Sequence, residues 1–201
     1  QSTVAVIAAG PKRQAKDYAA TSMMMRILGG SFSSRINMNL REDKGYSYGG
    51  RSYFGYSRDG SYLSAGARVR RDATVASVRE LFVEIEGVRE GPLKDEELHR
   101  ERSGAIAALP AAFSTANGSL RTLRSLLFYG LPLDWHAGYR KELEALDLEA
   151  VEAAGREHLP TDAHFVLVVG DGGEVREELQ GLAEERGASF VELDANGRER
   201  K

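Results

Sequence analysis

The four histidines are the residues whose spacing tests most directly for a metal site. They stand at positions 99, 136, 158 and 164. A catalytic zinc site usually needs three protein ligands, two of them often on one helical turn. The zinc-binding spacings H-E-x-x-H and H-x-x-E-H are both absent from the sequence. We interpret the separation of His158 and His164 as chance and His99 as part of a solvated helical face, so we predict no metal ligands in this chain.

The sequence also lacks the patterns of a nucleophilic hydrolase or a dinucleotide-binding protein. It contains no G-x-S-x-G elbow and no cysteine. Gly29 and Gly30 do not make a dinucleotide fingerprint, which needs a preceding strand and a third glycine. The segment "VVGDGGEVREEL" runs from a strand to a helix, but Asp171 and Glu174 place negative charge where a phosphate would bind. We therefore expect a helix-capping turn there and no complete catalytic centre.

Composition limits the remaining classes of function. The 201 residues are 42% hydrophobic and 28% charged, which is typical of one globular domain with a core of its own. The net charge of -3 gives no reason to expect a nucleic acid as partner, because nucleic acids need a basic face. No apolar run approaches the roughly 20 residues of a membrane span. Because the chain opens with Gln1 and not with Met, we expect a processed product or a piece of a longer protein.

The stretch "LGGSFSSRINMNLREDKGYSYGG", residues 28–50, holds the most unusual grouping of polar and aromatic residues. A strand beginning near Thr3 and a helix over residues 17–28 precede it, and its two glycines supply the stop of that helix. Ser33 or Ser34 can cap a second helix, which Gly45 ends. The run of three methionines in the first helix is interpreted as core packing.

The rest of the chain predicts a β-hairpin followed mainly by helices. "YSYGGRSYFGYSRDGSYLSAGARVR" indicates two antiparallel strands joined by a tight turn. Asp95 can cap the second of the later helices. We predict helices over residues 73–91, 95–109, 114–129, 135–146, 148–158 and 174–186, and strands over 163–171 and 188–193. This order of strands, helices and strands again indicates an α+β fold.

Two segments of the sequence resemble one peptidase family. Residues 28–50 are similar to the glycine-rich loop and the Arg/Tyr segment of the pitrilysin or insulinase family of zinc metallopeptidases, which includes mitochondrial processing peptidase. The segment from "LPAAFSTANGSLRTLRSLLFYGLPLDW" to "FVLVVGD" resembles the closing part of the C-terminal domain of that family. The resemblance covers roughly residues 3 to 170.

The resemblance implies one half of a two-domain clam, in which a mostly antiparallel sheet is covered by helices on one face. In that family one half binds zinc through an inverted H-x-x-E-H motif, and the other half carries no metal. This chain resembles the metal-free C-terminal half, with a domain over residues 1–195 and a tail over 196–201. No cofactor is expected in it, and zinc is expected in an N-terminal domain or subunit that would be its partner.

The resemblance further implies that Arg41 and Tyr48 are the catalytic residues of this half. Reversal of the chain at Gly45 would bring the two side chains together, with donors suited to substrate carbonyls and to an oxyanion. Because Tyr46 lies two residues before Tyr48, the sequence leaves open which of the two is the tyrosine of the family's motif. The substrate-binding residues would be Gly29, Gly30, Phe32 and Tyr46. In the alternative interpretation, Arg41 belongs to a solvated helix end, and Tyr46 and Tyr48 are ordinary aromatic residues of a strand. Arg35 would either position the loop or form a surface salt bridge.

Three hypotheses on function follow. The chain is the C-terminal half of one long peptidase, or a separate non-metal subunit, or an assembly protein of the same fold. In the first two, an extended peptide substrate would pair as an added strand. The chain alone is expected to be inactive, and an exported or periplasmic bacterial protein is a further expectation.

Overall fold

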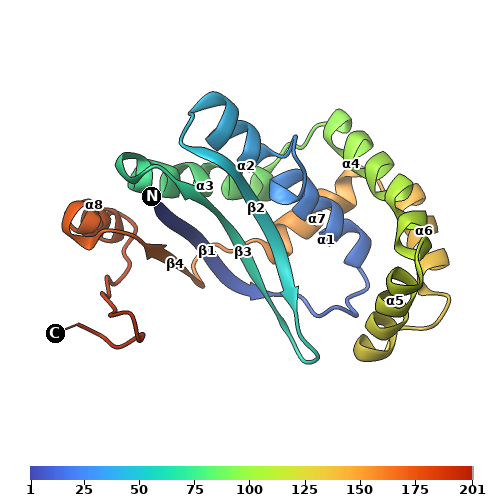
Figure 1. Cartoon of the computed structure of the whole chain (residues 1–201). Helices are drawn as coiled ribbons and strands as arrows, with labels where there is room; N and C mark the ends of the chain where they lie inside the picture. Colours follow the sequence, from blue (N-terminus) through green and yellow to red (C-terminus); the bar gives the residue numbers. More distant parts are fainter. Residues whose placement is uncertain (201) are drawn as a thin grey trace.

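The computed structural model describes residues 1–200, so Lys201 at the end of the expected tail lies outside it. One sheet lies against a layer of helices (Figure 1). None of the helices within residues 1–200 has the length and hydrophobicity of a membrane-spanning segment. The elements are β1 (Ser2–Gly10), α1 (Tyr18–Met25), a π-helical turn (Arg26–Gly30), α2 (Arg35–Asn37), a second π-helical turn (Met38–Asp43), β2 (Ser47–Tyr56), β3 (Ser61–Val69), a 3-10 turn (Arg71–Ala73), α3 (Thr74–Glu90), α4 (Asp95–Ala108), a second 3-10 turn (Leu109–Phe113), α5 (Ala116–Tyr129), α6 (Trp135–Ala145), α7 (Leu148–His158), β4 (His164–Val169) and α8 (Gly172–Glu185).

The sheet is antiparallel throughout, with the strand order β2-β3-β1-β4. β1 is central, because Val4 lies opposite Ala67 of β3 and opposite Val168 of β4. The predicted hairpin is confirmed: β2 and β3 are joined by a turn in which the Ser57 N–H donates to the Gly60 carbonyl over 2.8 Å. The α+β class and the antiparallel sheet are therefore confirmed, and β2 and β4 are the edge strands.

Alternation along the strands separates a buried face from an open one. Val4 and Val6 of β1 and Leu63 of β3 are fully buried. α1 and α3 pack on this side, and α7 packs on both of them. The expected core role of the methionine run is confirmed, because Met23 and Met24 are also fully buried. The helices of residues 1–200 thus leave the other sheet face to solvent.

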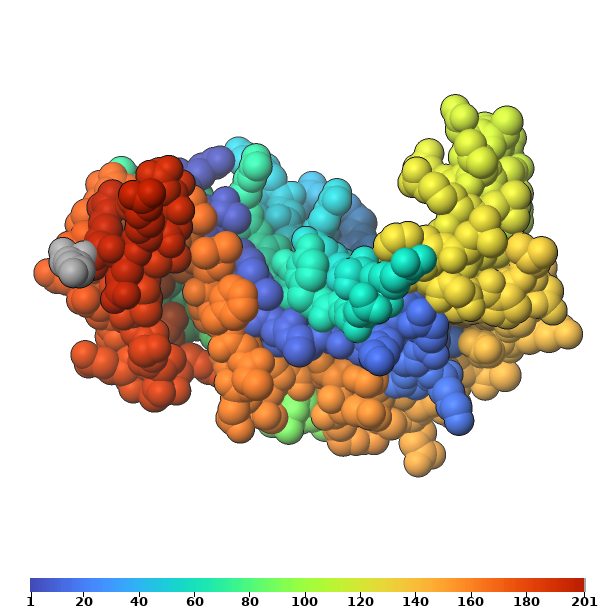
Figure 2. Space-filling model, turned by 90° about the horizontal axis from the view of Figure 1, so that it is seen from below, coloured from blue at the N-terminus to red at the C-terminus, as the bar shows by residue number. Residues whose placement is uncertain are grey.

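The helical hairpin of α5 and α6 projects from one end of the molecule, where its residues appear in yellow in Figure 2. Arg13, in the loop after β1, contacts both the body and this hairpin. Its guanidinium carbon lies 3.6 Å from the centroid of the Tyr18 ring and 4.3 Å from that of Trp135 in α6. Only 8% of Arg13 is exposed. The contact is a cation–π interaction of the strong, desolvated kind, so it helps to fix the hairpin in place.

Two expectations about local structure are wrong. Residues 188–193 form no strand, because β4 pairs only with β1 and the chain instead turns back on itself, with the Arg200 N–H donating to the Glu192 carbonyl. One isolated bridge, between Leu193 and Glu199, is all the pairing that this segment makes over residues 1–200. Asp95 does not cap α4 either. Lys94 holds the cap position, where its N–H donates to the Glu97 carboxylate over 3.0 Å.

Candidate functional site

The residues around the start of β2 line an open cavity of about 510 Å³. The cavity lies between the turn before α2, the second π-helical turn, the first residues of β2 and the end of β3. Its wall combines cationic, aromatic and small residues. The lining consists of Gln1, Phe32, Asn37, Arg41, Ser47, Tyr48, Gly49, Gly50, Arg51 and Arg68. Three of the residues singled out from the sequence, Phe32, Arg41 and Tyr48, therefore meet in one place.

Arg41 lies in the last turn before the chain reverses. Its guanidinium carbon is 4.6 Å from the centroid of the Phe32 ring, and Phe32 is 67% exposed. The Arg41 Nε atom is 3.2 Å from a carboxylate oxygen of the neighbouring Glu42. Both partners of this pair are solvated, so the pair holds the guanidinium only weakly. Most of the donors of Arg41 remain available to a ligand in the cavity.

Tyr48 is 92% exposed, which is an unusual position for a tyrosine at the start of a strand. An irregularity in the pairing of β2 with β3, between Ser47 and Gly50, turns this residue outward. The Ser47 hydroxyl donates to the Arg68 carbonyl over 2.6 Å, and the Gly49 N–H donates to the Ser47 hydroxyl over 3.0 Å. Bulges of this kind often re-aim a side chain beside a functional site.

Asn37 connects the two sides of the cavity, and the sequence analysis missed it. Its side-chain oxygen accepts from the Gly50 N–H over 2.8 Å, and its side-chain nitrogen donates to the Ser31 carbonyl over 2.9 Å. The loop that carries Phe32 is thereby attached to the strand that carries Tyr48. Asn has poor helix propensity and often hydrogen-bonds to nearby backbone groups. An Asn within a predicted helix was therefore the feature of the sequence that could have indicated this role.

The structure places three of the predicted substrate-binding residues outside this lining. The side chain of Tyr46 packs against the core. Its N–H donates to the Leu40 carbonyl over 2.8 Å, so the backbone at this position closes the preceding turn. Gly29 has a packing role, because a Cβ there would lie 2.5 Å from the Ser52 nitrogen. Gly30 likewise lies beside the Met25 carbonyl, at the end of the first π-helical turn.

Arg35 points away from the cavity to an ion pair. Its Nε and Nη2 atoms donate to the two carboxylate oxygens of Glu97, each over 2.7 Å, which joins α2 to α4. Burial by itself would raise the pKa of Glu97, but the hydrogen bonds from Arg35 and from the Lys94 N–H hold that pKa below its usual value. The same pair raises the pKa of Arg35. Arg35 is therefore a structural residue of the loop that carries Phe32.

The histidines do not assemble a metal centre in the cavity. The Nε2 atom of His158 is 2.6 Å from a carboxylate oxygen of Asp17, and Glu157 lies close by. This group shares no residue with the cavity lining. His164 contacts the Phe82 ring at a centroid distance of 5.1 Å, so His158 and His164 belong to separate surroundings.

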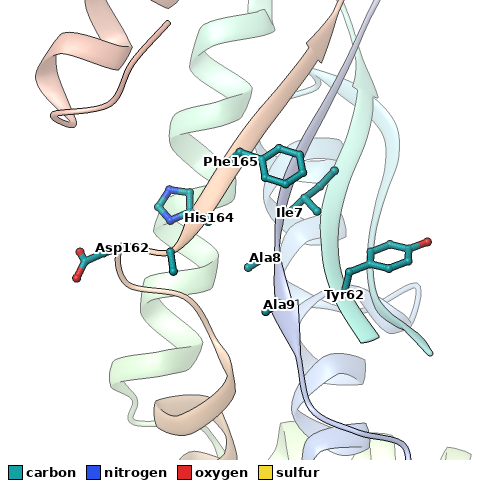
Figure 3. Close-up of a pocket in the computed structure, with 8 residues that line it drawn as sticks. Ile7, Ala8, Ala9, Tyr62, Asp162, His164 and Phe165 are labelled. Carbon is teal, nitrogen blue, oxygen red and sulfur yellow. The ribbon is translucent and has the colours of Figure 1, made fainter. Parts of the chain in front are cut away.

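A second cavity, of about 660 Å³, lies where β1, β3 and β4 meet (Figure 3). Figure 3 shows Ile7, Phe165 and Tyr62 on the open face and the His164 ring on the opposite side near Asp162. Burial and the nearby Arg186 lower the pKa of His164, so its imidazole is neutral near pH 7. This cavity offers an apolar surface with few donors, whereas the cavity at Tyr48 offers several cationic donors beside a phenol.

A comparison with models of protein families identifies residues 1–104 as a peptidase M16 inactive domain. Among curated proteins, the chain is 21% identical over 154 residues to the non-peptidase homolog YmxG of Helicobacter pylori. That alignment covers 76% of this chain and 36% of the relative, so the chain spans about a third of the length of this curated relative.

Solved structures show the same fold. The peptidase M16 inactive domain from Pseudomonas fluorescens superimposes with a TM-score of 0.75 at 23% identity, over 84% of this chain and 41% of that one. The inactive peptidase domain of a candidate zinc protease from Bordetella parapertussis gives a TM-score of 0.74 at 18% identity, over 84% of this chain and 92% of that one. At these identities the likeness establishes the fold.

Proposed function

The chain belongs to the family of peptidase M16 inactive domains, and from this premise we propose that it forms the metal-free wall of a peptide-binding cavity. In this proposal a partner domain or subunit supplies the zinc of a peptidase. Arg41 and Tyr48 contact the substrate next to the scissile bond. The resemblance of residues 28–50 to the pitrilysin or insulinase family is confirmed at the level of the family, whereas the roles of these two residues are our proposal.

The main support for the proposal is that two strong hydrogen-bond donors are exposed in the same cavity. The Tyr48 hydroxyl makes no hydrogen bond with any of residues 1–200, and the one carboxylate close to Arg41 belongs to the adjacent Glu42. A guanidinium and a phenol of this kind can bind a peptide carbonyl and stabilise the negative charge that develops on its oxygen during hydrolysis.

The residues of the cavity do not fit a zinc ion themselves. Zinc is bound by thiolate, imidazole or carboxylate groups. The lining has three arginines and lacks cysteine, histidine, aspartate and glutamate. The positive charge of the three arginines would repel a zinc ion, so these residues are suited to binding substrate and not to holding the metal.

An extended peptide fits the position of the cavity in the sheet. β2 is an edge strand, because β3 is its single neighbour in the order β2-β3-β1-β4. The backbone groups on the outer side of an edge strand can pair with an added strand. At the cavity end of β2 the Gly50 N–H is already bonded to Asn37, so pairing would begin after that residue. A peptide lying along β2 would pass Tyr48 at the beginning of that strand. Main-chain pairing would supply affinity that does not depend on the sequence of the peptide.

The second candidate function is that of a binding or assembly domain without hydrolysis. The name of the Helicobacter pylori relative, a non-peptidase homolog, favours it. In such a protein, substitution of Arg41 or Tyr48 would change the affinity for a peptide or would have no measurable effect. The two functions therefore differ in whether these side chains affect turnover.

The test is peptide hydrolysis by the protein together with its zinc-bearing domain or subunit. We expect Arg41→Ala and Tyr48→Phe each to lower kcat about a hundredfold, since loss of one oxyanion donor has an effect of about that size. Arg58→Ala and Tyr62→Phe are matched controls in the β2–β3 hairpin outside the cavity, and they should retain wild-type turnover. Wild-type turnover in Arg41→Ala and Tyr48→Phe would contradict the catalytic role. Absence of hydrolysis by the wild-type complex, with peptide binding retained, would favour the binding domain.

A further inference from the structure

The cavity at Tyr48 carries a concentration of positive charge, of which the proposed catalytic role uses Arg41 alone. Three arginines, Arg41, Arg51 and Arg68, line it together, and no acidic side chain does. We infer that the cavity selects peptides with an aspartate or glutamate side chain near the scissile bond. This inference rests on the proposed function, because it specifies the substrate class of the same cavity.

The geometry of the sheet places two of these arginines side by side on the open face. Arg51 of β2 lies directly opposite Gly66 of β3, and Arg68 lies two residues farther along β3. Diagonal neighbours of this kind have Cα atoms about 7–8 Å apart, within reach of long side chains. Gly66 is a glycine because β1 packs closely here, since a Cβ at this position would lie 2.3 Å from the Val4 carbonyl oxygen. Arg51 and Arg68 line the same cavity, so a carboxylate bound there can contact both guanidinium groups.

Two arginines that follow β3 in the chain are paired with carboxylates, unlike Arg51 and Arg68. Arg70 pairs with Asp72, and Arg71 pairs with Glu174 at 2.6 Å. Within residues 1–200, by contrast, no carboxylate oxygen lies within 4.0 Å of the side-chain nitrogens of Arg51 or Arg68. Like charges that share a cavity repel one another, and an anionic ligand would relieve this repulsion.

A side-chain carboxylate is the anion that best matches the site. The guanidinium fork binds planar carboxylates through two parallel hydrogen bonds. The cavity also contains Phe32 and Tyr48, which provide apolar surface for the backbone and stem of a peptide residue. Because β2 is the edge at which an extended peptide would pair, every second side chain of that peptide would face the same side as Arg51.

The experiment measures binding and hydrolysis of three matched peptides by the protein with its zinc-bearing partner. The peptides are blocked at both ends and differ at one position, which carries Glu, Gln or Lys. We expect the Glu peptide to bind about tenfold more tightly than the isosteric Gln peptide, the advantage of one charge-assisted contact. In the double variant Arg51→Gln/Arg68→Gln this Glu-to-Gln ratio should fall to about one. Arg58→Gln removes one positive charge from the same hairpin outside the cavity, and as the control it should keep the wild-type ratio.

A charge-reversal variant provides a second test, which does not depend on the size of the Glu-to-Gln affinity ratio. Arg68→Glu should shift the preference from the Glu peptide toward the Lys peptide. Equal binding of the Glu and Gln peptides by the wild-type protein would overturn the inference. A preference that survives in the double variant would overturn it too.

The two proposals fail in different ways. If the Glu preference is found and depends on Arg51 and Arg68, while Arg41→Ala and Tyr48→Phe leave turnover intact, the selectivity stands and the catalytic role falls. If those two variants lose turnover of the Gln peptide but the Glu-to-Gln ratio is one, the catalytic role stands and the selectivity falls. Anisotropy of labelled peptides reports binding whether or not hydrolysis occurs.

Discussion

At the scale of the residue, the shape of the cavity depends on groups that do not themselves provide charge. Asn37 satisfies the Gly50 N–H, and Gly50 packs so tightly that a Cβ there would lie 2.4 Å from the Ile36 side chain. A side chain at position 50 would therefore push β2 away from α2. The outward turn at Tyr48 is a consequence of this close packing and of the Ser47 hydroxyl.

Replacement of Asn37 by alanine tests this support. The change leaves the Gly50 N–H and the Ser31 carbonyl without their partner, and loss of such bonds costs about 1–3 kcal/mol. We expect a lower free energy of unfolding in urea and weaker peptide binding, with the loss in binding larger than in Asn117→Ala on the exposed surface of α5. Peptide affinity equal to wild type would show that Asn37 is not needed to hold the cavity.

At the scale of the element, an ion pair joins the short helix α2 to α4. Arg35 and Glu97 are 18% and 12% exposed, and both oxygens of Glu97 are engaged. Solvated pairs of this kind contribute little, whereas removal of one partner from a shielded pair is destabilising because it leaves a charge without compensation. The pair is the main polar contact between α4 and the helix that leads to Arg41, so it couples α4 to one side of the cavity.

The pair predicts a pH dependence of stability. The pKa of Glu97 is lowered in the folded state, so its contribution is present above the pKa of the unfolded state and is lost as the pH falls through the folded value. We expect wild-type stability to decline as the medium is acidified below about pH 4.3, the usual pKa of a glutamate. Glu97→Gln should be less stable at pH 7 and should show a shallower decline in acid. Parallel curves of unfolding free energy against pH would contradict this assignment.

At the scale of the whole molecule, Arg13 joins the sheet body to the α5–α6 hairpin. One of its terminal nitrogens is buried without a hydrogen-bond partner among residues 1–200, so the aromatic faces are its chief compensation. A guanidinium is more weakly hydrated than an ammonium, which makes its burial against rings feasible. The position of the hairpin thus depends on a contact between segments far apart in the chain.

Arg13→Ala should lower the free energy of unfolding by about 2 kcal/mol, the size of a desolvated cation–π contact. Denaturant unfolding followed by Trp135 fluorescence measures it, and Lys12→Ala at the neighbouring exposed position is the control. Arg13→Met separates charge from packing, since it keeps much of the volume. If Arg13→Met is as stable as wild type, the cation contributes nothing beyond its bulk.

The α+β class, the order of most elements and the family could be predicted from the amino-acid sequence, because these depend on local periodicity, turn residues and a contiguous motif. The sequence also pointed to Phe32, Arg41 and Tyr48, which lie close together in one segment. It failed for residues 188–193, whose apolar pattern is that of a strand but which pair with no strand of the sheet.

Which residues share the cavity could not be predicted, because it depends on contacts between distant segments of the chain. Arg51 and Arg68 belong to different strands and come together through the register of β2 with β3. Tyr46 and Tyr48 are equivalent in sequence terms, yet Tyr46 packs on the core and Tyr48 faces the cavity because of the irregularity after Ser47. Periodicity reports which face of an element is buried, but it carries no information on which other segment lies opposite. The charge of the cavity follows from such pairings.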